Sequence, residues 1–188
     1  MSTLLDDLMP AYDVHEVHDL WVPAAPAAAY EAVLAVQGRE VRLFGPLMLL
    51  RTLGRSRRAF DPRAPLLEQM LKIGFVQLGE RPGEEILVGA IGRFWSPLGN
   101  RPQPTEDFIG FAKPGYAKAA MNFTVTTEGK GSRVATETRI VGTDAGATRK
   151  FGRYWFVVRL GSGAIRKSWL KAIRRRLGKT SPEGAREE

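Results

Sequence analysis

The chain contains no cysteine among its 188 residues. This absence excludes disulfide bonds, thiolate metal sites and thiol nucleophiles. Histidine is scarce too, with two residues, and no run approaches the roughly 20 apolar residues that a membrane-spanning helix needs. The first ten residues, MSTLLDDLMP, include two aspartates and no basic residue, which is unlike a secretory signal. We therefore predict a cytoplasmic protein that folds around an ordinary apolar core.

The composition is that of a globular protein, with 44% hydrophobic and 26% charged residues. A chain of this length can bury a sizeable core without covalent cross-links. No internal repeat is visible. We predict an N-terminal extension over residues 1–11, a single domain over 12–178 and a polar tail over 179–188.

The net charge of +8 is unevenly distributed along the chain. Residues 149–188 contain 12 Lys and Arg against 3 Glu, whereas the preceding 148 residues are nearly balanced. The basic end is either a solvated helix face or a weak contact for phosphates of nucleic acid or anionic lipid. No motif predicts specific nucleic-acid binding. The residues that would make such a contact are Arg166, Lys167, Lys171, Arg174, Arg175 and Arg176.

The first third of the chain predicts one strand followed by short helices. Residues 12–22 are rich in Tyr, Val, His and Trp and end at Pro23, which is typical of a strand. Pro26 suits the first turn of a helix. A second short helix is expected over 46–53, then a basic loop over 54–65, and a third helix in LLEQMLK, residues 66–72.

The middle of the chain has the alternating pattern of antiparallel strands. Residues 73–95 form one predicted hairpin, with Pro82 and Gly83 in its turn. Residues 118–142 form a second, which turns at 128–131. Asp144 then suits the N-cap of a long amphipathic helix. Gly161 and Gly163 are expected to kink or interrupt that helix, whose apolar residues should pack against the concave face of the sheet.

Three segments carry a resemblance to a known family. They are WVPAAPAAAYEAV at 21–33, TETRIVGTD at 136–144, and the final helix with FGRYW at 151–155 and IRKSWLKAIRRR at 165–176. Together they resemble a bacterial branch of the SRPBCC superfamily, the START-like or helix-grip proteins that include the birch-pollen allergen and polyketide cyclases. The resemblance implies an α+β helix-grip fold, in which a curved antiparallel sheet wraps around a long C-terminal helix, with short helices after the first strand.

The family also implies a cavity between sheet and helix that binds lipids, sterols, hormones or polyketides, without a shared catalytic motif. We predict that an apolar ligand would contact Phe94, Met121, Phe123, Phe151, Tyr154, Trp155 and Val158, with His18, Glu137 and Arg139 as polar candidates. The alternative is that the aromatic residues are simply packed core.

The polar candidates each have two interpretations. His15 and His18 are three residues apart on a strand and so point to opposite faces, which argues against a shared metal ion. We predict neither a metal nor another cofactor. Glu137 and Arg139 share a face. Facing inward, they would orient a ligand carboxylate or carbonyl; facing outward, they would form a weak surface salt bridge. The more apolar alternate face, with Thr136, Thr138 and Ile140, would normally take the interior.

Three functions follow from these observations. The first is a non-catalytic carrier or sensor of an apolar small molecule such as a lipid, fatty acid or polyketide. The second is a cyclase or hydrolase on the same fold, which would need a polar cluster such as His18, Glu137, Arg139 and Tyr154. The third is binding to an anionic surface through the basic end. Since binding needs only an apolar lining and a few polar anchors, we expect the carrier rather than the enzyme.

Overall fold

The computed structural model describes residues 2–42, 44–45, 61–96, 103 and 107–180. The elements in chain order are α1 (Leu4–Leu8), β1 (Val14–Val22), α2 (Pro26–Ala35), η1 (Gly38–Glu40), α4 (Leu66–Lys72), β2 (Val76–Arg81), β3 (Glu85–Gly92), β4 (Ala117–Glu128), β5 (Gly131–Gly142) and α5 (Ala145–Thr180). The predicted helix at 46–53, most of the basic loop and residues 181–188 of the tail lie outside the described residues.

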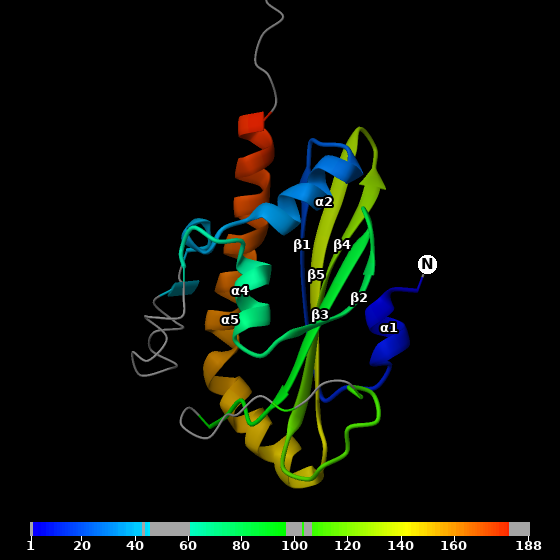
Figure 1. The fold of residues 1–188 in the computed structure, drawn as a ribbon, viewed down its shortest axis with the longest axis vertical. Helices are drawn as coiled ribbons and strands as arrows, with labels where there is room; N and C mark the ends of the chain where they lie inside the picture. The colour runs from blue at the N-terminus through cyan, green and yellow to red at the C-terminus, as the bar shows by residue number, and fades with distance from the viewer. Residues whose placement is uncertain (1, 43, 46–60, 97–102, 104–106, 181–188) are drawn as a thin grey trace, which may run out of the picture.

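The strands form one antiparallel sheet in the order β1-β5-β4-β3-β2. Figure 1 shows α5, α4 and α2 on one side of this sheet and the short α1 on the other. A long C-terminal helix lying across a curved antiparallel sheet is the helix-grip architecture, so the predicted α+β class is confirmed. No helix in the described part of the chain has the length and hydropathy needed to cross a membrane.

Each face of the sheet carries its own apolar core. The inner face, toward α5, holds the larger cluster, to which Met121, Phe123 and Val134 contribute from the sheet and Trp169 and Ile173 from α5. The outer face packs a smaller cluster under α1. Because side chains alternate along a strand, this division determines which face every polar strand residue occupies.

Both predicted hairpins are present. Strands β4 and β5 pair from Ala117 with Gly142 to Glu128 with Gly131, and Gly129 adopts a positive φ of 62° in the turn. Such a φ is strained for other residues. Within β3, a Cβ on Gly89 would lie 2.4 Å from Leu78 and 3.0 Å from the Ala119 carbonyl oxygen. A glycine there therefore lets the neighbouring strand and side chain approach closely.

Helix α5 begins as predicted and continues further than predicted. The Asp144 carboxylate accepts hydrogen bonds from the backbone N–H groups of Gly146 and Ala147, at 2.7 and 2.9 Å. The helix then runs without a break through Gly161 and Gly163, so the predicted interruption is absent, while Figure 1 shows α5 bending along its length, in line with the alternative prediction of a kink. Glycine costs a helix only about 1 kcal/mol per residue, and packing of the flanking turns against the sheet outweighs that cost.

Candidate functional site

A polar cluster lies between the sheet and the middle of α5. Glu16 and His18 project from the inner face of β1, and the His18 Nε2 atom is 2.9 Å from Glu16 Oε1. The Ser162 hydroxyl of α5 donates to Glu16 Oε2 at 3.2 Å. Both Glu16 and His18 are largely buried, at 16% side-chain exposure each. This places a hydrogen-bonded carboxylate and imidazole inside an otherwise apolar interface.

Gly163 allows α5 to approach this pair. A Cβ at this position would lie 2.8 Å from Glu16 Oε1 and 3.4 Å from His18 Nε2. Any side chain there would therefore displace the Glu16 carboxylate. The glycine that was expected to break the helix instead brings the helix backbone against the polar side chains of β1.

Arg166 is the cation of the cluster, one turn further along α5. Its guanidinium donates to Thr136 Oγ1 across 3.5 Å, which is its single hydrogen bond within the part of the chain that the structure describes. Burial lowers the pKa of Arg166 to about 10, although the nearby Glu16 carboxylate opposes that change. An arginine carries five N–H donors, so this half-buried side chain uses few of its donors within the described residues.

Two further polar atoms of this interface have no hydrogen-bond partner among the described residues. They are Thr138 Oγ1 on β5 and Trp169 Nε1 on α5. Both residues are more than nine-tenths buried, with Thr138 6% exposed and Trp169 3% exposed. The Trp169 ring lies against Phe123, with ring centroids 4.8 Å apart. Unpartnered buried polar groups are uncommon in native proteins and call for an explanation.

The predicted apolar lining residues fall on either side of this polar cluster along α5. Met121 and Phe123 belong to the main inner core. Phe94, Tyr154 and Trp155 pack around the buried Phe151 near the start of the helix, with ring centroids 5.8–6.3 Å from that of Phe151. Val158 is half-buried between the two groups. The structure thus places all the predicted apolar residues on the α5 side of the sheet, in two separate clusters.

Glu137 and Arg139 are on the opposite face of the sheet. Arg139 donates to the backbone carbonyl of Met9 at 3.0 Å and to Asp6 Oδ1 at 2.5 Å, both next to or within α1. Glu137 accepts from Arg139 at 2.6 Å and lies 2.8 Å from His15 Nε2. The inward arrangement of Glu137 and Arg139 is therefore not the one adopted, and this network instead holds α1 against the sheet. His15 and His18 occupy opposite faces, as predicted.

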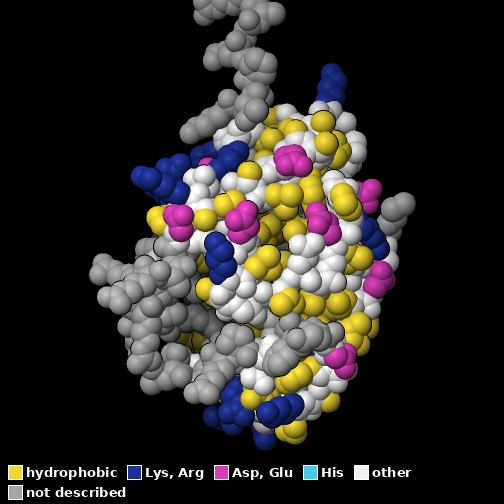
Figure 2. Space-filling view, in the orientation of Figure 1, with side chains coloured by type: hydrophobic (Ala, Val, Ile, Leu, Met, Phe, Trp, Pro, Cys, Tyr) yellow, Lys and Arg dark blue, Asp and Glu magenta, His cyan; other side chains and the backbone are white. Residues whose placement is uncertain are grey.

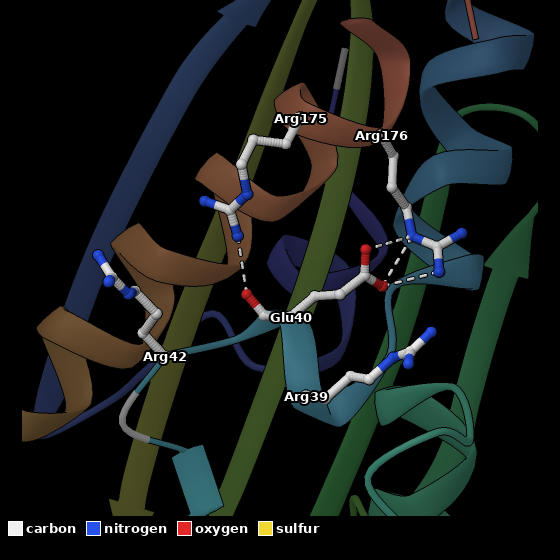
Figure 3. Close-up of a pocket in the computed structure, with 5 residues that line it drawn as sticks. All are labelled: Arg39, Glu40, Arg42, Arg175 and Arg176. Carbon is white, nitrogen blue, oxygen red and sulfur yellow. Dashed lines mark hydrogen bonds and ion pairs between the residues drawn. The ribbon is translucent and has the colours of Figure 1, made fainter. Parts of the chain in front are cut away.

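The predicted basic contact residues differ in whether they face solvent or the sheet. Lys167, Lys171, Arg174 and Arg175 are exposed, whereas Arg166 faces the sheet. Figure 3 shows the arginines that surround a pocket of about 390 Å³ beside the C-terminal half of α5, lined by Arg39, Glu40, Arg42, Arg175 and Arg176. Arg176 donates to the Glu40 carboxylate at 2.8 Å and Arg175 donates to the Glu40 carbonyl at 2.8 Å. Four guanidiniums against one carboxylate make this end of the helix attractive to anions.

A second pocket, of about 380 Å³, is lined by Arg93, Trp95, Ser96, Gly115 and Lys150. Neither of these pockets includes the cluster around Arg166. No group of three or more metal-ligating side chains occurs in the described residues.

Sequence reasoning missed Glu16, Thr138, Ser162, Arg166 and Trp169 as members of one site. The alternation of β1 puts Glu16 on the same face as His18, and this signal was available in the sequence. Helical spacing likewise places Arg166 between Ser162 and Trp169 on the inward stripe of α5. The density of basic residues around Arg166 hid that position, because a charge run usually lies on a solvated face.

No family model and no curated protein matches the sequence. Solved structures match at low similarity. They include MLL2253 from Mesorhizobium loti (11% identity, TM-score 0.42, covering 90% of this chain and 100% of that chain). They also include CalU16 from Micromonospora echinospora (13%, 0.31, 88% and 83%) and Ara h 8.0201 (9%, 0.33, 89% and 99%). With TM-scores below 0.5, these similarities carry no inference about function, and the helix-grip description rests on the arrangement of sheet and helix itself.

Proposed function

We propose that the protein binds an apolar small molecule that carries a carbonyl or carboxylate oxygen, between the inner face of the sheet and α5. The observation that supports this proposal is the set of donors at the centre of the interface: the Arg166 guanidinium, the Trp169 indole N–H and the Thr138 hydroxyl. Thr138 and Trp169 are buried and Arg166 is half-buried, each with few or no partners among the described residues, and each can donate to an acceptor oxygen. A lipid, fatty acid or polyketide offers such an oxygen on an apolar body.

The surroundings of these donors favour an elongated apolar ligand. Apolar and aromatic clusters lie on both sides of the polar cluster along α5. Small-molecule sites are mostly apolar with a few placed polar groups that set orientation. Burial of apolar area at roughly 25 cal/mol per Å² supplies most of the affinity of such ligands, and the donors select the ligand class.

The test begins with native mass spectrometry of protein purified without denaturation, since a retained ligand identifies itself by mass. Isothermal titration then compares three compounds of the same chain length: a long-chain carboxylic acid, its methyl ester and the corresponding alkane. We expect a dissociation constant in the micromolar range or below for the acid, and a negative heat-capacity change. Failure of every apolar class to bind contradicts the proposal.

A pair of variants assigns the polar anchor. Arg166→Met keeps an unbranched apolar stem and removes the donors, so the affinity for the acid should fall by about 10- to 100-fold, the effect of losing one charged hydrogen bond. Arg174→Met removes an exposed arginine from the same helix and should leave the affinity unchanged. Equal affinities for the two variants would exclude Arg166 as the anchor.

An enzyme on the same site is the second candidate, favoured by the hydrogen bond between His18 and Glu16. An imidazole that is oriented by a carboxylate is a common general base. His18→Gln separates the two functions, because a carrier keeps its bound compound unchanged with either residue. Conversion of the co-purified compound by the wild-type protein, lost in His18→Gln, would establish the enzyme instead.

A further inference from the structure

The outer face of α5 presents large apolar side chains to solvent. Phe156, Val157 and Leu160 are 73, 76 and 79% exposed, the highest values among the large hydrophobic residues that the structure describes. Their spacing places them on one side of the helix, turned away from the buried Phe151 and Trp169. Single exposed apolar residues are ordinary, whereas a contiguous group marks a contact surface.

Every charged residue on this helix is positive. Residues 145–180 contain 11 Lys and Arg and no Asp or Glu. Arg149 and Arg153 are exposed before the apolar group, and Lys167 and Lys171 are exposed after it. At the spacings of an α-helix these four residues share a side with Phe156 and Leu160. Figure 2 shows Lys and Arg side chains gathered near the lower end of the molecule, where α5 begins. The solvent face is therefore an apolar patch between two basic ends.

We propose that this face of α5 docks on the surface of an anionic lipid membrane. The patch of Phe156, Val157 and Leu160 enters the boundary between headgroups and acyl chains, and the flanking Lys and Arg side chains contact lipid phosphates. A helix with an exposed apolar face and a basic surround, too polar to cross the bilayer, binds in this manner. The surface extends about 33 Å along the helix from Arg149 to Lys171, at a rise of 1.5 Å per residue.

Charge complementarity favours a lipid surface over other partners. A second copy of the chain would bring another wholly cationic helix against this one, and like charges across an interface oppose association. Nucleic acid would satisfy the basic ends through its phosphates, but it offers no apolar surface to Phe156, Val157 and Leu160. An anionic membrane satisfies both the basic and the apolar parts. This inference is independent of the proposed ligand, which concerns the opposite face of the helix.

Vesicle co-sedimentation tests the proposal with three variants. The wild-type protein should bind vesicles of phosphatidylcholine mixed with phosphatidylglycerol, should bind phosphatidylcholine alone at least tenfold more weakly, and should be released as salt is raised. The triple variant Phe156→Ser, Val157→Ser, Leu160→Ser should bind at least tenfold more weakly than the wild type. The double variant Arg149→Gln, Arg153→Gln should reduce binding to the anionic vesicles. Ile109→Ser, which removes an apolar residue 66% exposed outside α5, should bind as the wild type does.

The opposite results are equally clear. The substituted side chains are exposed, so the variants should remain folded, and circular dichroism and thermal melting check this. Undiminished vesicle binding by the triple variant overturns the insertion of the patch, and absence of binding to anionic vesicles overturns the docking surface. If wild-type protein is a dimer by light scattering, ignores vesicles, and becomes monomeric in the triple variant, the face is an interface between copies instead. DNA binding that exceeds vesicle binding and survives the triple variant assigns the face to nucleic acid.

Discussion

Replacing Arg166 with methionine should make the protein more stable. Arg166 has the usual high pKa of an arginine in the unfolded chain, and burial lowers this pKa to about 10 in the folded protein. That difference corresponds to about 3 kcal/mol of free energy against the charged side chain. One hydrogen bond of 3.5 Å, to Thr136, offsets little of this cost. Replacing a poorly compensated buried charge with an apolar side chain commonly stabilises a protein by about 1–4 kcal/mol.

The pH dependence of the cost follows from the direction of the pKa change. Because the folded pKa is the lower one, the unfolded chain binds more protons as the pH rises above about 10, and stability rises with pH there until the unfolded chain also loses the proton. Below about pH 10 both states are protonated at Arg166 and the full cost is present. We therefore expect Arg166→Met to be about 1–3 kcal/mol more stable than the wild type at pH 7, after loss of the attraction to Glu16.

Urea denaturation followed by tryptophan fluorescence measures this difference in unfolding free energy. The dependence of the unfolding free energy on urea concentration should be the same for both proteins if only stability changes. The thermal midpoint should rise by about 2–4 °C for each kcal/mol. Arg174→Met, at an exposed position, should lie within about 0.5 kcal/mol of the wild type. An Arg166→Met protein less stable than the wild type by about 1 kcal/mol or more would refute the reasoning, because it would show that Glu16 fully compensates the buried cation.

Two further predictions concern the two faces of the sheet. Trp169→Ala should lower the free energy of unfolding by about 3–5 kcal/mol, since the residue is 3% exposed. Trp155→Ala should lower it by less than half as much, because Trp155 is half-buried. Equal losses of stability in urea titrations would mean that the inner core is wrongly placed. A backbone hydrogen bond from Thr3, followed by the Arg139 guanidinium, lowers the pKa of Asp6 to about 2, so this carboxylate stabilises the fold above about pH 4 and loses the effect as pH falls through 2. Asp6→Asn should be about 1 kcal/mol less stable at pH 7, with allowance for solvent screening of a half-exposed group, and no less stable at pH 2; a difference that persists at pH 2 would exclude the charge as its cause.

Much of the fold could be predicted because local rules determine it. The β4–β5 hairpin follows from strict alternation around a Gly129 turn, and the start of α5 follows from the Asp144 cap. Alternation also predicted that Thr136 and Thr138 would face the interior. In each case the signal lies within a few residues, and the tertiary structure agrees with it.

The candidate site was harder to predict because it combines residues from distant elements. Glu16 and Ser162 are separated by 146 positions and meet only because β1 lies beneath α5. The contact of Gly163 with Glu16 and His18 also depends on tertiary structure, because helix propensity identifies this glycine only as a weak point of the helix. Glu137 and Arg139 show the converse case. Their pairing was predicted, but their face depends on α1, whose carbonyl groups and Asp6 provide the partners of Arg139.

The two sides of α5 both depart from the arrangement that stability alone would favour. On the inner side, the Arg166 cation is half-buried against the sheet, and Thr138 and Trp169 hold polar atoms without a partner among the described residues. On the outer side, within ten residues of Arg166, Phe156, Val157 and Leu160 face water. Polar groups inside and apolar groups outside each cost free energy, and exchanging their types would remove both costs. Local departures of this kind concentrate at functional sites, and here, apart from Thr138 on β5, they lie within about four turns of α5, from Phe156 to Trp169. We infer that this stretch of α5 is constrained by partners on both sides, a ligand toward the sheet and a surface toward solvent.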